Sequence, residues 1–300
     1  MIAVVGATGH TGKRVSADLL EAGAKVRVIG RTADKVQRFV AKGAEAFTGE
    51  VLDTNAMTRA FTGCAAVYLL VPPDQKHPNQ LAHYAAVAES LATALEKSGA
   101  THAVLLSSVG AHLAQGAGPV SGLHGFEERL KRVANVNVLF LRAAYFMENF
   151  YTPVTVYRSM GFFSGLVKGD AMMPMIASRD IGQRAAKHLL ALDFSGKQIE
   201  ELLGQRDLTM NECARIFGAA IGKQNLSYMQ APAMMAKPAM MQSGMSADLA
   251  DKLIEMCKAI NDGIMAPTEP RNAVNTTPTS FETFTAEVLV PLYQGKPPAD

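Results

Sequence analysis

Hydrophobic and polar positions follow two different periods along the first half of the chain. Short apolar runs with the character of β-strands are separated by stretches in which apolar residues recur every three to four positions, as in helices. The strand-like runs are Ile2–Val5, Lys25–Ile29, Ala66–Val71, Ala103–Leu106 and Val136–Leu141. The helical stretches are Gly12–Ala22, Ala33–Lys42, Asn55–Phe61, Asn79–Lys97 and Gly125–Val133.

These strand-like runs lack the polar alternation of a half-exposed strand, which indicates that both faces of the sheet are covered. Regular alternation of strand and helix predicts right-handed βαβ units and a parallel sheet. We therefore expect an α/β fold with a doubly wound parallel sheet over residues 1–152.

The pattern changes after about residue 150, where helical spacing dominates. Asp180–Leu192 and Asp248–Asp262 are predicted amphipathic helices, and so is Thr209–Ile221. In the last of these, Thr209 as N-cap and Glu212 three residues later form the signature of a capping box.

Residues 153–300 are expected to form a smaller, mainly helical C-terminal lobe that closes a substrate pocket, with the part around residues 176–192 packing back on the first lobe. Methionine is concentrated here, because thirteen of the sixteen methionines follow residue 158. Flexible, polarizable side chains suit an adaptable apolar pocket or lid, and they equally suit a loosely packed small core.

Charge and cysteine usage narrow the class of protein. The 29 lysines and arginines nearly balance 27 acidic residues, and neither half is basic enough to follow a phosphate backbone, so we expect no direct nucleic-acid partner. Cys64, Cys213 and Cys257 are too widely spaced for a disulfide framework or a metal site. The absence of a signal peptide and of a membrane-spanning run completes the expectation of a cytoplasmic protein.

The most informative motif is the glycine-rich segment VVGATGHTG at residues 4–12. In such a loop the first glycine permits a tight turn, the second lets the backbone approach a pyrophosphate, and the third lets the helix pack on the strand. The helix N-terminus then faces the phosphates. A plain βα turn is the alternative, but the position after the first strand of a βαβ unit favours a Rossmann sheet that binds a dinucleotide. The candidate residues are Gly6, Ala7, Thr8, Gly9, His10, Thr11 and Gly12.

The end of the second strand predicts which dinucleotide is bound. An acidic residue there would bind the ribose 2′-hydroxyl of NAD, whereas this chain has Arg31, followed by Lys35. Cations at this point accommodate the 2′-phosphate of NADP. A solvated arginine is the alternative, and NADP(H) is the predicted cofactor.

Further candidates for the cofactor site follow other strands. Asp53, after the third strand, could accept a hydrogen bond from the adenine amino group. The flat, donor-poor turn after the fourth strand could lie against the adenosine and nicotinamide portions, and Ser107 ends the fifth strand at the crevice. The residues of that turn are Val71, Pro72 and Pro73.

Together these segments resemble the NmrA-like family of atypical short-chain dehydrogenases/reductases over most of the chain. The glycine loop and the basic Arg31–Lys35 segment match that family, as do "DIG" at residues 180–182 and TPTSFETF at residues 277–284. Residues 146–149 resemble its segment after the sixth strand, and the resemblance implies that they line the nicotinamide end of the cofactor. These residues are Phe146, Met147, Glu148 and Asn149.

The chain departs from typical short-chain dehydrogenases in its catalytic residues. Those enzymes use a tyrosine with a lysine four positions later, and none of the seven tyrosines here has one. The family often has a lysine or histidine near the cofactor where this chain has His124, so the resemblance implies that His124 contacts nicotinamide or substrate. A histidine that caps the helix or faces solvent is the alternative.

Two functions fit these observations. The first is an NADPH-dependent reductase that transfers hydride to a flat electrophilic acceptor such as a quinone, held by Tyr145 and Phe146. Such an acceptor needs no strong acid, because its reduction gives a stabilised anion. The second is a non-catalytic protein that senses NADP(H) and signals to a partner. A homodimer or a regulatory protein partner is compatible with either function.

Overall fold

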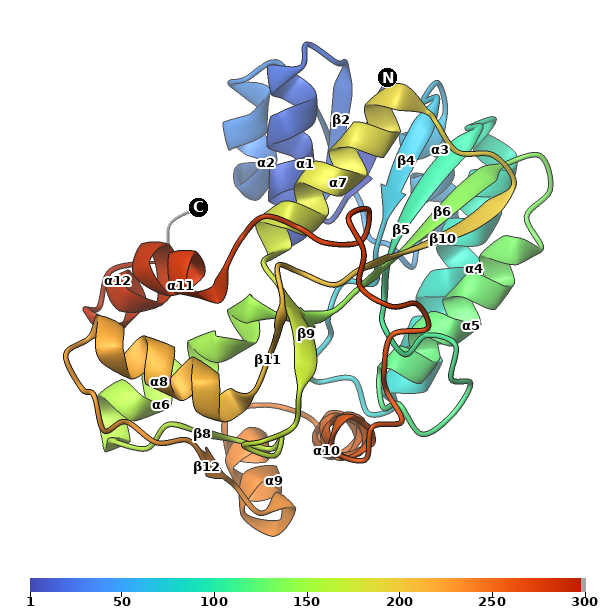
Figure 1. The fold of residues 1–300 in the computed structure, drawn as a ribbon. Helices are drawn as coiled ribbons and strands as arrows, with labels where there is room; N and C mark the ends of the chain where they lie inside the picture. Colours follow the sequence, from blue (N-terminus) through green and yellow to red (C-terminus); the bar gives the residue numbers. More distant parts are fainter. Residues whose placement is uncertain (298–300) are drawn as a thin grey trace.

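The computed structural model describes residues 1–297 and has a parallel seven-stranded sheet at its centre (Figure 1). Its strands are β1 Ile2–Val5, β2 Val26–Gly30, β3 Glu45–Thr48, β4 Ala66–Leu69, β5 His102–Ser108, β6 Asn137–Ala143 and β10 Lys197–Leu202. They lie side by side in the order β10-β6-β5-β4-β1-β2-β3, and every neighbouring pair is parallel. This confirms the predicted doubly wound α/β sheet.

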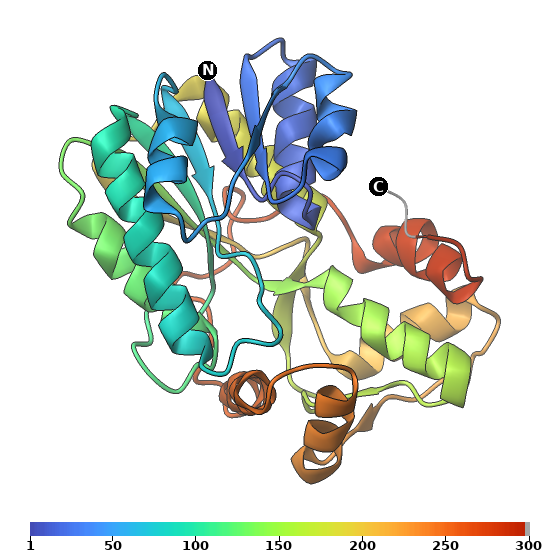
Figure 2. The same ribbon diagram turned by 180° about the vertical axis from the view of Figure 1, so that it is seen from behind.

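Helices cover both faces of this sheet (Figures 1 and 2). One face packs against α1 His10–Glu21, α2 Ala33–Val40 and α7 Ser178–Ala191. The other packs against α3 Thr54–Phe61, α4 Gln80–Ser98 and α5 Val120–Lys131. Successive residues of β1 alternate between the two cores, with Val4 in one and Val5 in the other. The unbroken apolar character of the strands follows from this double burial.

A second lobe forms a third core from later parts of the chain. Its strands are β7 Tyr145–Phe146, β8 Ser164–Gly165, β9 Met173–Ile176, β11 Asp207–Leu208 and β12 Met229–Gln230. Its helical elements are the 3-10 helix η1 Met147–Phe150, α6 Tyr151–Met160, α8 Met210–Ala220, α9 Ala233–Gln242, α10 Ala247–Asn261, α11 Phe281–Phe284, the π-helical turn η2 Thr285–Leu289 and α12 Val290–Tyr293. Two small sheets, β11-β9-β7 and β12-β8, connect them.

The capping box predicted in the second half is confirmed. The Thr209 side chain accepts from the Glu212 backbone while the Glu212 carboxylate accepts from the Thr209 backbone, so the capping box is complete. Helix α7 packs along α1, and a Cβ on Gly182 would lie 2.6 Å from the Cβ of Arg14. Only a glycine lets the two helices approach this closely.

The sheet contains two strands that the apolar runs do not include, and they form its two edges. Strand β3 has the sequence EAFT and pairs with β2, and strand β10 has the sequence KQIEEL and pairs with β6. The chain therefore returns to the central sheet after β9, and both α7 and β10 pack with the first lobe. The boundary after residue 152 stays a prediction, and the last three residues of the predicted second lobe, 298–300, lie outside the described part.

Within residues 1–297, no helix has both the length and the apolar character needed to cross a bilayer.

Candidate functional site

The strand order creates a topological switch point beyond the carboxyl ends of β1 and β4, where a crevice is expected. From β1 the chain builds the sheet outwards through β2 and β3, whereas β4, β5 and β6 extend it in the opposite direction. Ligands of open α/β sheets bind at such a switch point. Gly6 follows β1 here with φ of +65°, and a Cβ on it would lie 3.0 Å from the side chain of Leu70, which follows β4.

The glycine loop has the geometry of a phosphate cradle. The Gly9 N–H donates to the carbonyl oxygen of Gly6 at 2.9 Å, which closes the turn. A Cβ on Gly12 would lie only 2.3 Å from the same oxygen, so α1 starts directly against the loop. Gly9 caps α1 without a side chain, and the only atom within 4 Å of a Cβ built on it is the Gly6 oxygen at 3.4 Å. The residues thus fit a dinucleotide phosphate at the positive end of α1.

The remaining loop residues differ in accessibility. Ala7 and Thr11 are buried, and the Ala7 N–H donates to the Ile29 carbonyl of β2. Thr8 is half-buried, whereas His10 is exposed at the first position of α1. The His10 ring lies edge-on to the Tyr151 ring with centroids 5.8 Å apart, which brings the loop next to the second lobe.

The three predicted adenosine-binding side chains are exposed beyond β2 and β3. Arg31 directly follows β2 and Lys35 lies in the first turn and a half of α2; within the described residues neither makes an ion pair. Asp53 is the N-cap of α3, and its carboxylate accepts the Ala56 N–H at 2.9 Å. Asp53 therefore has a role in the fold that is independent of its predicted contact with adenine.

The segment after β4 is fixed by a buried histidine. Val71 and Pro72 are half-buried and Pro73 is exposed. The His83 Nε2–H of α4 donates to the Pro72 carbonyl at 3.2 Å. This contact holds the predicted flat wall at the edge of the crevice.

Ser107 is buried at the end of β5, where its hydroxyl donates to the Glu127 carboxylate at 2.6 Å. Glu127, on α5, also forms a bidentate ion pair with Arg142 of β6, at 2.6 and 3.0 Å. Both charged side chains are almost fully buried. Sequence reasoning missed this pair, although an arginine inside the apolar strand β6 was a visible signal.

His124 lies in the second turn of α5, which begins at Val120 rather than at Gly125 as predicted. Its Nδ1 lies 2.9 Å from the Ala111 carbonyl, an atom that can only accept, so Nδ1 carries the hydrogen. The neutral ring then presents Nε2 as an acceptor, and only the imidazolium form donates a proton from Nε2. Ala111 lies in the loop after β5, so the histidine ring contacts the segment that follows the carboxyl end of that strand.

The segment that follows β6 passes from the first lobe into the second. Tyr145 is packed edge-on against Phe150, and burial raises the pKa of its phenol well above the ordinary value. Phe146 packs on the core of the first lobe, and Met147 is buried in that of the second. Asn149 is exposed.

Two of the family-like motifs hold α7 in place. The Glu148 carboxylate accepts from both the N–H and the hydroxyl of Ser178, at the first turn of α7. The buried Asp180 carboxylate accepts from the N–H and the hydroxyl of Thr279, at 3.0 and 2.6 Å. These contacts tie the segment before the C-terminal helices to the helix that covers α1.

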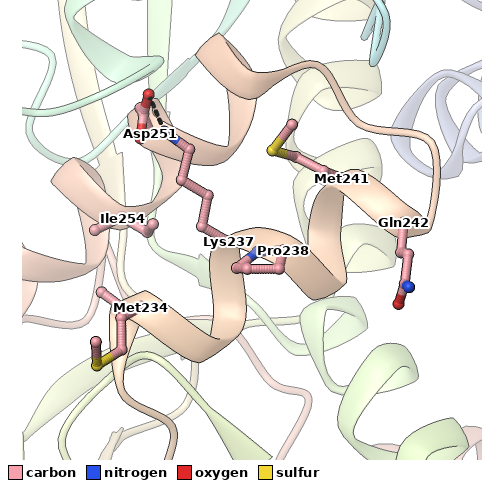
Figure 3. A pocket seen from close by; sticks show the side chains of 8 residues that line it. Met234, Lys237, Pro238, Met241, Gln242, Asp251 and Ile254 are labelled. Atoms are coloured by element: carbon pink, nitrogen blue, oxygen red, sulfur yellow. Dashed lines mark hydrogen bonds and ion pairs between the residues drawn. The ribbon is translucent and has the colours of Figure 1, made fainter.

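The methionines of the second half occupy two kinds of environment, a buried core and an open groove. Met173, Met175 and Met210 are buried in the core of the second lobe. In contrast, α9 has no buried residue, and its Met234 and Met241 line an open groove of about 880 Å³ against α10 (Figure 3). The Lys237–Asp251 ion pair spans this groove (Figure 3). None of the predicted site residues lines it.

The strand order and the glycine cradle define a doubly wound α/β protein of the Rossmann type. Within that class the chain belongs to the NmrA-like family, whose pattern it matches over residues 1–285.

Known relatives and solved structures cover most of the chain. A (4-alkanoyl-5-oxo-2,5-dihydrofuran-3-yl)methyl phosphate reductase of Streptomyces griseus is 28% identical over 242 residues, covering 79% of this chain and 81% of that protein. An NADPH-dependent quinone oxidoreductase of Escherichia coli, solved with NADPH, aligns over 100% of this chain and 96% of its own, with a TM-score of 0.77 and 22% identity. A Citrobacter sp. triphenylmethane reductase complexed with NADP(H) has a TM-score of 0.78 and 18% identity, covering 94% of this chain and 98% of its own.

Proposed function

We propose that this protein is an NADPH-dependent reductase that transfers a hydride to a flat electrophilic acceptor such as a quinone. The observation that carries the proposal is the glycine cradle at the switch point of the sheet, with the Arg31 guanidinium one strand away. The two solved reductases of the same fold were crystallised with NADPH or NADP(H), and the Streptomyces relative is also named a reductase.

In this proposal, different residues of the crevice bind different parts of the cofactor and the acceptor. The first turn of α1 binds the pyrophosphate, and Arg31 with Lys35 binds the 2′-phosphate by charge-assisted hydrogen bonds. Val71–Pro73 forms a flat wall, and Tyr145 and Phe146 hold the acceptor over the nicotinamide ring. A bound NADPH would supply the hydride.

The acid groups of the crevice favour an acceptor that needs little help from a proton donor. Reduction of an ordinary ketone leaves an alkoxide, which requires a placed acid. Tyr145 has no lysine partner to activate it, and burial raises its pKa instead of lowering it. His124 donates a proton from Nε2 only when it is an imidazolium ion. A quinone or another conjugated carbonyl gives a resonance-stabilised anion, for which this weak donor or water suffices.

The acceptor class is tested by steady-state assays with NADPH in which 1,4-benzoquinone is compared with cyclohexanone. We expect the quinone to be reduced at least about a hundredfold faster, which is the contribution that a general acid typically makes to a reaction that needs one. Equal rates with the two acceptors would refute the proposed acceptor class.

The same assay tests His124, which we propose as the proton donor at the acceptor. His124→Ala is expected to lower kcat for the quinone, whereas Glu128→Gln, on the same helix and engaged with Lys131 at the surface, is the matched control. Tight NADPH binding without turnover of any acceptor would instead support the NADP(H)-sensing protein.

Replacing Arg31 by serine is expected to weaken NADPH binding by about tenfold to a hundredfold, because a charge-assisted contact contributes about 1.5–3 kcal/mol. NADH lacks the 2′-phosphate, so its affinity should not fall. Isothermal titration calorimetry with both nucleotides measures the change. Lys25→Gln, a substitution of an exposed cation before β2, serves as control. An equal loss of affinity for NADH and NADPH would show that Arg31 does not select the phosphate.

A further inference from the structure

A second cavity, of about 380 Å³, lies on the flank of α1 that faces away from the sheet. One side is formed by α1 and α2 of the first lobe, and the other by the start of α6 and by α11 with η2. Both views show α11 on the same side of the molecule as α1 and α2, below them (Figures 1 and 2). The cavity shares His10 and Glu148 with the predicted cofactor residues but contains none of Arg31, Asp53 and Ser107.

The wall contributed by the second lobe is aromatic. The rings of Tyr151 and Phe284 are stacked nearly parallel, with an interplanar angle of 7° and centroids 6.4 Å apart. The His10 ring meets Tyr151 edge-on and extends this surface to the start of α1. An aromatic ligand ring can pack against such a wall by offset stacking or edge contacts.

The wall contributed by α1, α2 and α7 is basic. Five cationic side chains line the cavity, against three carboxylates. Two of the carboxylates are already engaged, because Glu148 accepts from Ser178 and Glu287 pairs with Arg179 at 2.5 Å. Of the cations, Arg179 is in that same pair and Arg14 pairs with Asp18 at 2.8 Å, so the net charge of the lining is positive but smaller than the count of cations. The cationic side chains are Lys13, Arg14, Arg38, Lys42 and Arg179.

Four of these cations come from α1 and from α2 with the residues just beyond it. Lys13 and Arg14 lie in the first turn and a half of α1, and Lys42 lies just beyond the end of α2. The Arg38 guanidinium lies over the Phe39 ring at 4.9 Å, so its planar group is held at the cavity surface. Within the described residues, the Lys42 ammonium makes no hydrogen bond or ion pair. An anion in the cavity would therefore meet cations from both helices.

We propose that this cavity binds a small aromatic anion, with its ring on Tyr151 and Phe284 and its carboxylate or phosphate group toward α1 and α2. The volume suits a ligand of one or two rings. Because the two walls belong to different lobes, the ligand joins the lobes while the cofactor crevice stays accessible. The cavity meets the predicted cofactor residues only at His10 and Glu148, so it adjoins the reductase site proposed above and is a different site.

The test uses 2-naphthoate as probe and the full-length protein, with binding measured by isothermal titration calorimetry in the absence and presence of saturating NADPH. We expect binding under both conditions and at least tenfold weaker binding of the neutral 2-naphthylmethanol, because a charged hydrogen bond contributes about that factor or more. Competition between naphthoate and NADPH would place the probe in the cofactor crevice and overturn the proposal.

Two pairs of variants locate the probe. Arg14→Gln/Lys42→Gln should weaken naphthoate binding about tenfold or more, whereas Lys25→Gln/Arg59→Gln removes the same charge from exposed positions outside the cavity. Tyr151→Leu should also weaken it, whereas Tyr157→Leu, on the same helix but outside the cavity, should not. Unchanged affinity in both cavity variants would overturn the proposal, and circular dichroism verifies that each variant is folded.

Discussion

Replacing Gly12 by alanine is expected to abolish detectable NADPH binding and to lower the free energy of unfolding by about 3 kcal/mol. The added Cβ would lie 2.3 Å from the Gly6 carbonyl oxygen and 2.8 Å from the Gly6 carbonyl carbon. Both are backbone atoms of the cradle, so α1 and the loop must separate, and overpacking of this kind costs about 1–3 kcal/mol. Urea unfolding and calorimetry with NADPH measure the two effects.

Two other glycines provide controls that separate folding from binding. A Cβ on Gly125 of α5 meets no atom within 4 Å, so Gly125→Ala should increase stability by about 0.5–1 kcal/mol, as in other helix interiors. A Cβ on Gly9 has only the Gly6 oxygen within 4 Å, at an ordinary 3.4 Å. Gly9→Ala should therefore fold normally and still lose NADPH affinity, because the methyl group occupies the phosphate position. Wild-type stability of Gly12→Ala would contradict the close packing of α1 on the loop.

The cradle could be predicted from the sequence because its geometry is local. Gly6, Gly9 and Gly12 act within one βα turn, and the steric reasons for each glycine do not depend on distant parts of the chain. The positions of Val71 and Ser107 could be predicted for a related reason, since parallel strands carry their carboxyl ends to one edge of the sheet. The order of the strands then brings these ends together.

Features that depend on contacts between distant parts of the chain could not be predicted from the sequence. Strand β10 is polar and becomes a strand through its pairing with β6, some sixty residues earlier. The aromatic and basic cavity combines α1 with Phe284, which is more than 260 residues away in the sequence. Hydrophobic periodicity reports which face of an element is buried, but it does not report which element covers that face.

The position of Ser107 was predicted from the sequence, but its hydrogen bond to Glu127 was not. It lies at the end of β5, as the pattern indicates, but its hydroxyl donates to Glu127. The reason is the Arg142 guanidinium, which brings the Glu127 carboxylate between the sheet and α5. A buried ion pair requires additional hydrogen bonds for its remaining lone pairs, and Ser107 supplies one of them. The serine therefore connects the crevice to a charged group inside the protein.

Replacing Arg142 by methionine is expected to lower the free energy of unfolding by about 3–5 kcal/mol, because it leaves the Glu127 carboxylate buried without its cation. The methionine fits the apolar surroundings of β6, so the loss measures the unpaired charge more than lost volume. Urea denaturation followed by circular dichroism gives the value. Lys131→Met breaks a surface ion pair with Glu128 on the same helix and should cost only about 0.5 kcal/mol.

The double variant Glu127→Met/Arg142→Met distinguishes the charge from the packing. With both charges removed, most of the lost stability should return, since apolar replacements of buried ion pairs are often neutral or stabilising. Ser107 then lacks its acceptor, so recovery should fall short by about 1 kcal/mol, and adding Ser107→Ala should restore that remainder. If the double variant is as unstable as Arg142→Met, the ion pair is not what the single substitution disrupts. Because Glu127 and His124 lie on adjacent turns of α5, kcat for the quinone in the triple variant would report whether this buried pair also positions the histidine.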